Sequence, residues 1–509
     1  DRTPTVEEIQ DIVEMMIAAR GHWDVAKRYV IYRAARAQVR LAAHGANGLQ
    51  DYIFLSRYSR YREDLGRRET PSEAFTRVMD MHRDHFADRV DLPVTGFGNR
   101  TLRSLMAETE AALQRRAILP SMRSLQFGGR AIEANNARMF NCAFTHMDRL
   151  DAFKESFFLL MSGTGVGFSV QKQHVAQLPT FPLRAAENEL PVVHYLVPDT
   201  LEGWADALDA LIRSYVDGTK VEFNFSAVRS RGQQLRTSGG RAPGHLPLKK
   251  ALLAAERMLD QVPGRALRPI EVYDIMMHVA VAVLSGGIRR SATICLFSSD
   301  DDEMAAAKTG NWFETNSQRG KSNNSAVLVR ETVQPSDFSK LFEFQKEFGE
   351  PGFYFVDDAE YGANPCVEIG LAPYMIVDEV AQAKLAKYGR PDVAIGSRVS
   401  GWQMCNLTTI NAGACDTEES FLACCRAASL LGTMQAAYTN IPYLGAATRV
   451  INERESLLGV SICGILDRPS LLLNPSVLER GAKECLDTNA AIAEHLGIEP
   501  AARITCVKP

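Results

Sequence analysis

The sequence lacks the features of a secreted, membrane-spanning or nucleic-acid-coating protein. Ten cysteines in 509 residues are far too few for a disulfide scaffold, and no Cys-x-x-Cys motif is present, so we expect free thiols and no bound metal. Even a long apolar run, residues 275–284, is well short of the ~18–20 residues that cross a bilayer. The 57 basic and 61 acidic residues give a net charge of −4, which argues against a nucleic-acid partner. A globular, cytoplasmic protein with no membrane partner is the expected class.

The hydrophobic patterning divides the chain into a helical N-terminal part and a mixed remainder. Residues 1–40 have helical spacing in two segments, and residues 51–118 are again mostly helical. From Leu119 onward, short apolar runs alternate with longer amphipathic stretches, which predicts an α/β domain. The Gly- and Arg-rich stretches 221–248 and 285–291 are expected to be loops.

Three of the ten cysteines have unusual surroundings. Cys142, Cys366 and Cys405 follow Asn, Pro or Met in short polar segments rather than in apolar runs. We expect the others to be packing residues, as buried free cysteines usually are. These seven are Cys295, Cys415, Cys424, Cys425, Cys463, Cys485 and Cys506.

The segment around Cys366 combines three kinds of reactive side chain. On an extended strand, Asn364, Cys366 and Glu368 would project from the same face. A carboxylate beside a thiol raises the pKa of the thiol, so this setting suits one-electron thiol chemistry better than nucleophilic attack. From spacing alone, a functional site and an ordinary strand cysteine with polar neighbours are about equally favoured.

Six short motifs follow one another along more than half of the chain. They are 119–123, 141–142, 162–170, 285–291, 364–368 and 405–407. In this order they resemble the signatures of the large catalytic chain of ribonucleotide reductases. Four further segments, 66–70, 203–205, 241–244 and 507–509, resemble the adenosylcobalamin-dependent (class II) triphosphate reductases. The resemblance implies an α/β fold, a ten-stranded ribonucleotide-reductase barrel that is incomplete at its C-terminus and preceded by a helical region.

The resemblance assigns roles to the unusual cysteines and their neighbours. Cys366 would carry a transient thiyl radical, with adenosylcobalamin as the cofactor that generates it. Glu368 would be the general base at the ribose 3′-hydroxyl, and Asn364 would hold the ribose hydroxyls. Cys142 and Cys405 would be the dithiol that reduces the 2′ carbon and ends as a disulfide, which requires them to meet on neighbouring strands.

Further positions correspond to nucleotide contacts of the family. Ser121, Asn141, Gly163 and Gly165 match positions that lie against the substrate. The glycine spacing G-x-G-x-G is not the dinucleotide fingerprint, so a Rossmann site is not expected. Four residues resemble parts of the site that senses an allosteric deoxynucleotide effector: Asp148, Gly287, Arg289 and Arg290.

The resemblance also suggests domain limits. Residues 1–45 resemble the last two helices of an ATP-cone, residues 51–118 the helical N-terminal region of a reductase, and residues 119–509 a barrel that stops before the phosphate-binding loop and final strands. Because the chain starts at Asp1 and stops at Pro509 after an apolar segment, we expect a fragment. A complementary C-terminal polypeptide is therefore among the expected partners.

Substrates and alternatives follow from the same resemblance. The expected reaction turns ribonucleoside triphosphates, rather than diphosphates, into 2′-deoxyribonucleotides for DNA synthesis, with a thioredoxin-like reductant. A long segment between Gly167 and Ser285 favours a monomer, and the stretch 377–388 is expected to be a surface insertion. Three alternatives stay open: a class I or diphosphate-specific chain, a split-enzyme half that is inactive alone, and an unrelated α/β-barrel enzyme.

Overall fold

The computed structural model describes residues 6–30, 48–234, 241–284 and 292–506. Two compact units, 1–75 and 76–509, are distinguished by their contacts. The first unit contains helix α1 (Val6–Ala19), helix α3 (Gly48–Arg57) and an antiparallel pair of short strands, β1 (Tyr61–Arg62) and β2 (Arg67–Arg68). Helix α4 (Pro71–His85) begins in the first unit and ends in the second.

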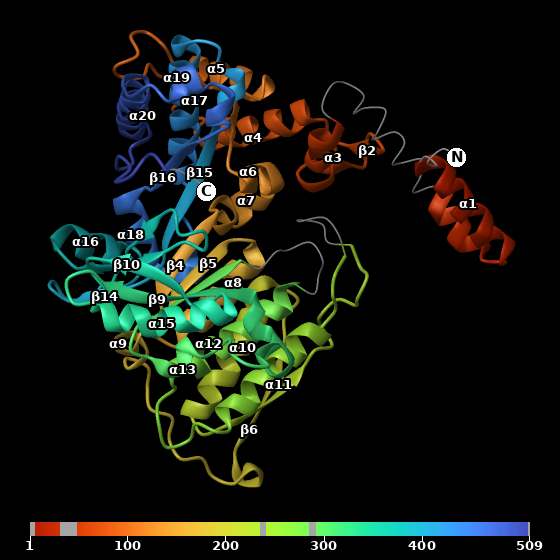
Figure 1. The fold of residues 1–509 in the computed structure, drawn as a ribbon, viewed down its shortest axis with the longest axis vertical. Helices are drawn as coiled ribbons and strands as arrows, with labels where there is room; N and C mark the ends of the chain where they lie inside the picture. The colour runs from red at the N-terminus through yellow and green to blue at the C-terminus, as the bar shows by residue number, and fades with distance from the viewer. Residues whose placement is uncertain (1–5, 31–47, 235–240, 285–291, 507–509) are drawn as a thin grey trace. The chain divides into compact units, whose positions relative to one another are not determined.

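An eight-stranded mixed sheet forms the centre of the second unit (Figure 1), in the order β10-β9-β8-β5-β4-β15-β16, with β3 paired to β15. The strands from β10 to β4 run parallel to one another, and β16 runs parallel to β15. The two groups meet at β4 and β15, which are antiparallel. The strand bounds are β3 (Ile118–Leu119), β4 (Cys142–His146), β5 (Gly165–Ser169), β8 (Thr293–Ser298), β9 (Ser322–Val329), β10 (Gly352–Val356), β15 (Gln403–Asn411) and β16 (Leu458–Cys463). This sheet and its helices confirm the predicted α/β class.

The central strands are buried on both faces, which explains their continuous apolar sequences. Every residue of β4 and β5 is buried. Four helices pack into the main core: α8 (Asp151–Ser162), α10 (Leu201–Val216), α11 (Leu246–Leu259) and α12 (Pro269–Leu284). Helix α17 (Glu418–Ala436) packs on β15 and β16 and against helix α20 (Pro475–Leu496), as Figure 1 shows in blue. The sheet therefore lies inside helical layers.

Three smaller two-stranded sheets surround the main sheet. Strands β6 (Val192–Leu196) and β7 (Lys220–Asn224) are parallel and joined through α10. A hairpin is formed by β11 (Gly362–Ala363) and β12 (Gly370–Leu371). A second antiparallel pair consists of β13 (Tyr374–Ile376) and β14 (Arg398–Ser400), and helix α16 (Glu379–Lys387) lies between these two strands in the sequence.

The other α-helices in the described part of the second unit connect these elements along the chain. They are α5 (Leu102–Gln114), α6 (Met122–Phe127), α7 (Arg130–Ala134), α9 (Lys172–Val175), α13 (Asp302–Ala305), α14 (Trp312–Thr315), α15 (Pro335–Phe348), α18 (Gly445–Glu455) and α19 (Pro469–Leu472). In the described part of the chain, no helix has both the length and the apolarity that a membrane span requires.

Two expectations about local structure were wrong. The stretch 221–248 begins as strand β7, because Val221 and Phe223 alternate with polar residues and pair with β6, and ends in α11. Two of the seven cysteines expected to be packing residues are not fully buried, because Cys463 is exposed at the end of β16 and Cys506 is partly exposed.

Candidate active site

Two predicted site cysteines lie opposite each other where the two strand groups meet. Cys142 on β4 and Cys405 on β15 are direct partners in the antiparallel register, and their side chains are hydrogen-bonded. Both are buried, with exposed fractions of 6% and 1%. The Cys142 thiol, burial and the charge of Glu368 all raise the pKa of Cys405 well above its ordinary value, so Cys405 is a protonated thiol at neutral pH. The fold thus creates a buried dithiol from distant parts of the chain.

The hairpin β11–β12 carries the other three predicted catalytic residues. Its connecting loop, 364–369, contains Asn364, Cys366 and Glu368. The expectation that these residues share one face of an extended strand was wrong, because the loop folds back through turns. The Asn364 side chain accepts a hydrogen bond from Ile369 N–H at 3.1 Å, and Val367 N–H donates to the Asn364 carbonyl at 2.9 Å. Val367 has a φ of 66°, which is strained for a β-branched residue.

The loop brings Asn364 and Glu368 close to the dithiol. Asn364 is fully buried, and its Nδ2 donates to Cys142 Sγ at 3.5 Å. Glu368 is half-buried and close enough to raise the pKa of Cys405. Cys366 is exposed, unlike the dithiol. Asn364 and Glu368 therefore lie beside the dithiol, and the third thiol, Cys366, is exposed in the same loop.

The glycine motif lets the hairpin lie directly on the sheet. Gly163 ends α8 with a φ of +94°. A β-carbon at Gly165 would lie 3.3 Å from Pro365 Cγ, and one at Gly167 would lie only 2.3 Å from the Ala363 carbonyl oxygen. The absent side chains at Gly165 and Gly167 thus leave room for the chain's own hairpin. Substrate contact by Gly163 and Gly165 stays a prediction.

Ser121 and Asn141 belong to a buried polar network beside the dithiol. Ser121 Oγ donates to Asn141 Oδ1 at 2.8 Å, and Asn141 N–H donates to the Cys405 carbonyl at 3.1 Å. The Gln435 side chain accepts from Ser121 N–H at 3.1 Å and donates to Asn406 Oδ1 at 2.8 Å. Sequence reasoning missed Gln435, although a lone glutamine in the apolar stretch of α17 was a usable signal.

The predicted effector residues are only partly described. Asp148 is buried just after β4 and pairs with Arg149 at 3.1 Å. Gly287, Arg289 and Arg290 lie outside the described residues. The role of all four as effector contacts stays a prediction.

A second polar cluster, which sequence reasoning also missed, lies at the ends of β4 and β5. His146, His174 and Glu360 place three potential metal-ligand atoms within 4.8 Å of one another. The Arg398 guanidinium, however, donates to His146 Nδ1 at 3.0 Å and to the Glu360 carboxylate. A resident cation and lone pairs already engaged in hydrogen bonds make this cluster a poor metal site.

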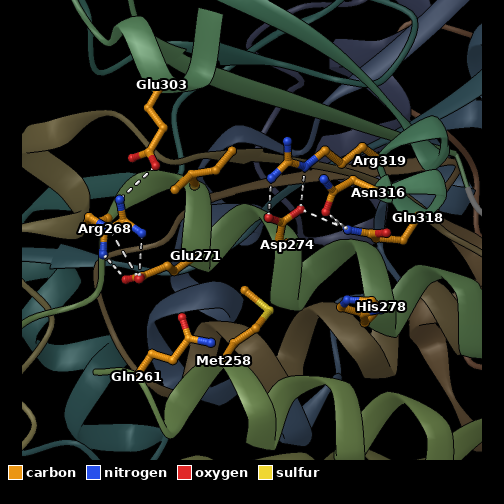
Figure 2. Close-up of a pocket in the computed structure, with 11 residues that line it drawn as sticks. Met258, Gln261, Arg268, Glu271, Asp274, His278, Glu303, Asn316, Gln318 and Arg319 are labelled. Carbon is orange, nitrogen blue, oxygen red and sulfur yellow. Dashed lines mark hydrogen bonds and ion pairs between the residues drawn. The ribbon is translucent and has the colours of Figure 1, made fainter. Parts of the chain in front are cut away.

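A separate cavity of about 260 Å³ lies along α11 and α12 (Figure 2). Figure 2 shows Arg319 facing Asp274 and Arg268 facing Glu271 and Glu303, with N–O distances of 2.6, 3.0 and 2.7 Å respectively. None of the described site residues lines this cavity. Its guanidinium groups are neutralised by its own carboxylates, so it offers no unpaired positive charge to a phosphate.

Comparisons with known proteins give a consistent result. A family model described as the ATP cone domain matches residues 1–38. The chain is 26% identical over 359 residues to an adenosylcobalamin-dependent ribonucleoside-triphosphate reductase of Euglena gracilis, covering 64% of this chain and 47% of that protein. It is 30% identical over 263 residues to the enzyme of the same name from Lactobacillus leichmannii, covering 42% and 35%. The chain thus spans less than half the length of these relatives.

The fold is also similar to a solved structure. A crystal structure of a B12-dependent (class II) ribonucleotide reductase matches with a TM-score of 0.70 at 22% identity, covering 90% of this chain and 72% of that chain. The predicted resemblance is therefore confirmed: the chain is similar to adenosylcobalamin-dependent ribonucleoside-triphosphate reductases and has the fold of the ribonucleotide reductase barrel.

Proposed function

We propose that the full-length protein reduces ribonucleoside triphosphates to 2′-deoxyribonucleotides by thiyl-radical chemistry. The observation that carries the proposal is the direct pairing of Cys142 with Cys405 beneath a hairpin that holds Asn364, Cys366 and Glu368. A buried, protonated dithiol is a two-electron reductant with protons to give. The triphosphate preference is supported by the names of the relatives.

Each side chain has a role that balances the reaction. The Cys366 thiol loses a hydrogen atom, and its sulfur radical takes the ribose 3′ hydrogen. Glu368 accepts the 3′-hydroxyl proton, while the 2′-hydroxyl leaves as water with a proton from the Cys142–Cys405 pair. That pair also supplies the hydrogen that replaces the hydroxyl on the 2′ carbon, gives up two electrons in all and becomes a disulfide. Glu368 returns its proton to the 3′ oxygen, and Cys366 returns the hydrogen atom to the 3′ carbon. The net change is ribonucleotide plus dithiol to deoxyribonucleotide, disulfide and water.

The exposed position of Cys366 suits a cofactor that must reach its sulfur. Cys366 and Val367 are both exposed, whereas the dithiol is buried, so a bulky group has access to the first thiol and not to the pair. Adenosylcobalamin, when bound, supplies a carbon radical by homolysis of its carbon–cobalt bond. In this chain, Cys366 and Val367 would contact it, and Cys366 would give up its hydrogen atom.

We also propose nucleotide contacts and partners for the same site. Ser121, Asn141, Gly163 and Gly165 contact the substrate beside the dithiol. Asp148, with the segment containing Gly287, Arg289 and Arg290, binds a deoxynucleotide effector. A thioredoxin-like reductant restores the dithiol after each turnover.

The test is deoxynucleotide formation by the full-length protein with ribonucleoside triphosphates, adenosylcobalamin and dithiothreitol. Cys366→Ser should abolish the product, because a hydroxyl does not replace the thiol as a hydrogen-atom donor. Cys463→Ser is the matched control, since Cys463 is also exposed but lies at the end of β16, and should keep full activity. Product formation by Cys366→Ser would refute the radical assignment. A strict need for a metal-containing second subunit would favour a class I reductase.

A further inference from the structure

The loop that carries Cys366 needs support from outside its own hairpin. The two strands are only two residues long, and the loop contains the strained Val367. On the outgoing side, the Ala372 N–H donates to the buried Gln403 side chain at 2.5 Å. The incoming side has a larger set of contacts, centred on Glu360.

Glu360 lies between β10 and β11 and is held by two histidines. Its carbonyl oxygen accepts from His146 Nε2 at 2.9 Å, and its carboxylate accepts from His174 Nε2 at 3.1 Å. The two imidazole rings are stacked, with centroids 3.7 Å apart and planes at 14°. His174 Nδ1 lies 2.8 Å from the Ser169 hydroxyl on β5, so the histidines connect the hairpin to the central strands.

Arg398 completes this cluster from a different part of the chain. Its Nη2 donates to the second Glu360 carboxylate oxygen and to His146 Nδ1, and its guanidinium lies over the Tyr374 ring at 4.8 Å. Its Nη1 also lies 3.6 Å from the buried carboxylate of Asp148. One guanidinium therefore joins the base of the hairpin, strand β4 and Asp148. Lysine would keep the positive charge here. It has a single ammonium group instead of a planar guanidinium, so it would make only part of these contacts.

The segment that supplies Arg398 is itself rigidly packed. Arg398 begins β14, which pairs with β13. The two strands and α16 share a small apolar core with α18, made of Met375, Val377, Ala381, Leu385, Val393, Val450 and Ile451. This is the region expected to be a surface insertion between Cys366 and Cys405. Its packing gives Arg398 a fixed position from which to hold Glu360.

We infer that Arg398 is a positioning residue that holds the Cys366 loop against the dithiol through Glu360, and that the 374–400 segment serves to deliver it. The inference rests on the proposed function for its catalytic consequence. The positioning itself is a property of the described chain and can be measured without turnover.

Hydrogen exchange of the protein measures the positioning directly. In Arg398→Met, backbone amides of 361–371 should exchange about tenfold faster, while those of β8 should keep their protection. Arg398→Lys should restore part of the protection. The matched control is Arg390→Met, because Arg390 belongs to the same segment but makes only an exposed pair with Asp392. Unchanged exchange at 361–371 in Arg398→Met, or equal loss at β8, would overturn the inference.

Kinetics of the full-length protein separate this inference from the proposed function. Arg398→Met should lower kcat for deoxynucleotide formation about tenfold or more with a smaller rise in KM. The displaced loop carries Cys366 and Glu368 as well as the ribose contact Asn364, whereas the substrate contacts on the sheet stay in place. Arg398→Lys should recover part of kcat, and Arg390→Met all of it. If the wild type forms no deoxynucleotide but the exchange result holds, the proposed function fails and the positioning role stands. Normal kcat and exchange in Arg398→Met would leave the function standing and refute the role of Arg398.

Discussion

At the scale of residues, the cross-strand pairing of Cys142 with Cys405 places two thiols at the distance that a disulfide requires. Directly opposed residues in an antiparallel pair have Cα atoms roughly 4.5–5.5 Å apart, and a disulfide needs roughly 4.4–6.8 Å. The pair can therefore be oxidised and reduced without moving β4 or β15. Burial keeps other thiols and solvent away, so the pair cycles only with partners that reach it.

Oxidation of the protein with diamide should link Cys142 to Cys405. Peptide mass spectrometry after alkylation under denaturing conditions should find this linkage, and Cys405→Ser should eliminate it. Cys295→Ser is the control, since Cys295 is buried on β8 away from the pairing and its loss should leave the linkage unchanged. Oxidised protein in which Cys142 and Cys405 are both recovered as thiols would contradict the pairing.

Gln435 should be a large contributor to stability, although it performs no chemistry. Gln435→Leu removes the hydrogen bonds that the Gln435 side chain makes with the Ser121 N–H, the Ser124 hydroxyl and Asn406 Oδ1. We expect the free energy of unfolding in urea to fall by about 2–5 kcal/mol, because unsatisfied buried polar groups are costly. Gln177→Leu, at an exposed position on the surface, should change it by less than about 0.5 kcal/mol. Equal effects of the two substitutions would show that the network is not a stabilising one.

At the scale of elements, the fit between the hairpin and the sheet depends on missing side chains. Gly362 lies under the Phe144 ring, where a β-carbon would come within 1.9 Å of Cζ, and Gly167 meets the Ala363 carbonyl. Strands β4 and β5 thus present a surface shaped for the hairpin. The hydrogen bonds within the hairpin determine the conformation of its turn, and the contacts with the sheet determine where the hairpin lies.

Gly167→Ala should push the hairpin off the sheet. Its β-carbon would lie 2.3 Å from a backbone oxygen, so we expect a loss of about 1–3 kcal/mol in urea unfolding and faster exchange of the 361–371 amides. Gly370→Ala in the same hairpin is the control, because no atom lies within 4 Å of its added carbon. If Gly167→Ala exchanges like Gly370→Ala, the close contact is not what locates the hairpin.

At the scale of the whole second unit, two parallel strand groups meet in antiparallel orientation and helices cover them. This arrangement buries polar side chains as well as apolar ones. Burial lowers the pKa values of His82 and His146 to about 3, below their ordinary 6.5. Both histidines are therefore neutral in the folded protein throughout the physiological range.

Stability should fall as the pH drops below 6.5. In the unfolded chain these histidines take up protons below pH 6.5, whereas in the folded protein they stay neutral until about pH 3, so their contribution is complete above pH 6.5 and is lost between these values. Each histidine should lower the free energy of unfolding by about 1.4 kcal/mol for every pH unit that the pH falls within this range. Urea unfolding at pH 7.0 and 5.0 measures the slope. His82→Gln should make it shallower, and His194→Gln, at an exposed position, should not. A slope that is the same in all three proteins would argue against buried neutral histidines.

The sequence by itself determined the fold class, the resemblance to ribonucleotide reductases and the choice of Cys142, Cys366 and Cys405. These features depend on local patterns, such as short apolar runs, ordered motifs and the polar neighbours of particular cysteines. The sequence did not predict the turn at 364–369. Side-chain alternation suggested a strand there, but Pro365 and the Asn364 hydrogen bonds close a loop instead.

Only the tertiary structure decided what lies beside these residues. The register that joins Cys142 to Cys405, the Gln435 network and the link from Arg398 to Glu360 all depend on contacts between segments far apart in the chain. Such contacts follow from sheet order and helix packing, which local periodicity does not encode. The sequence motifs indicated which side chains are reactive, and the packing of the whole unit determined their distances, their burial and their protonation.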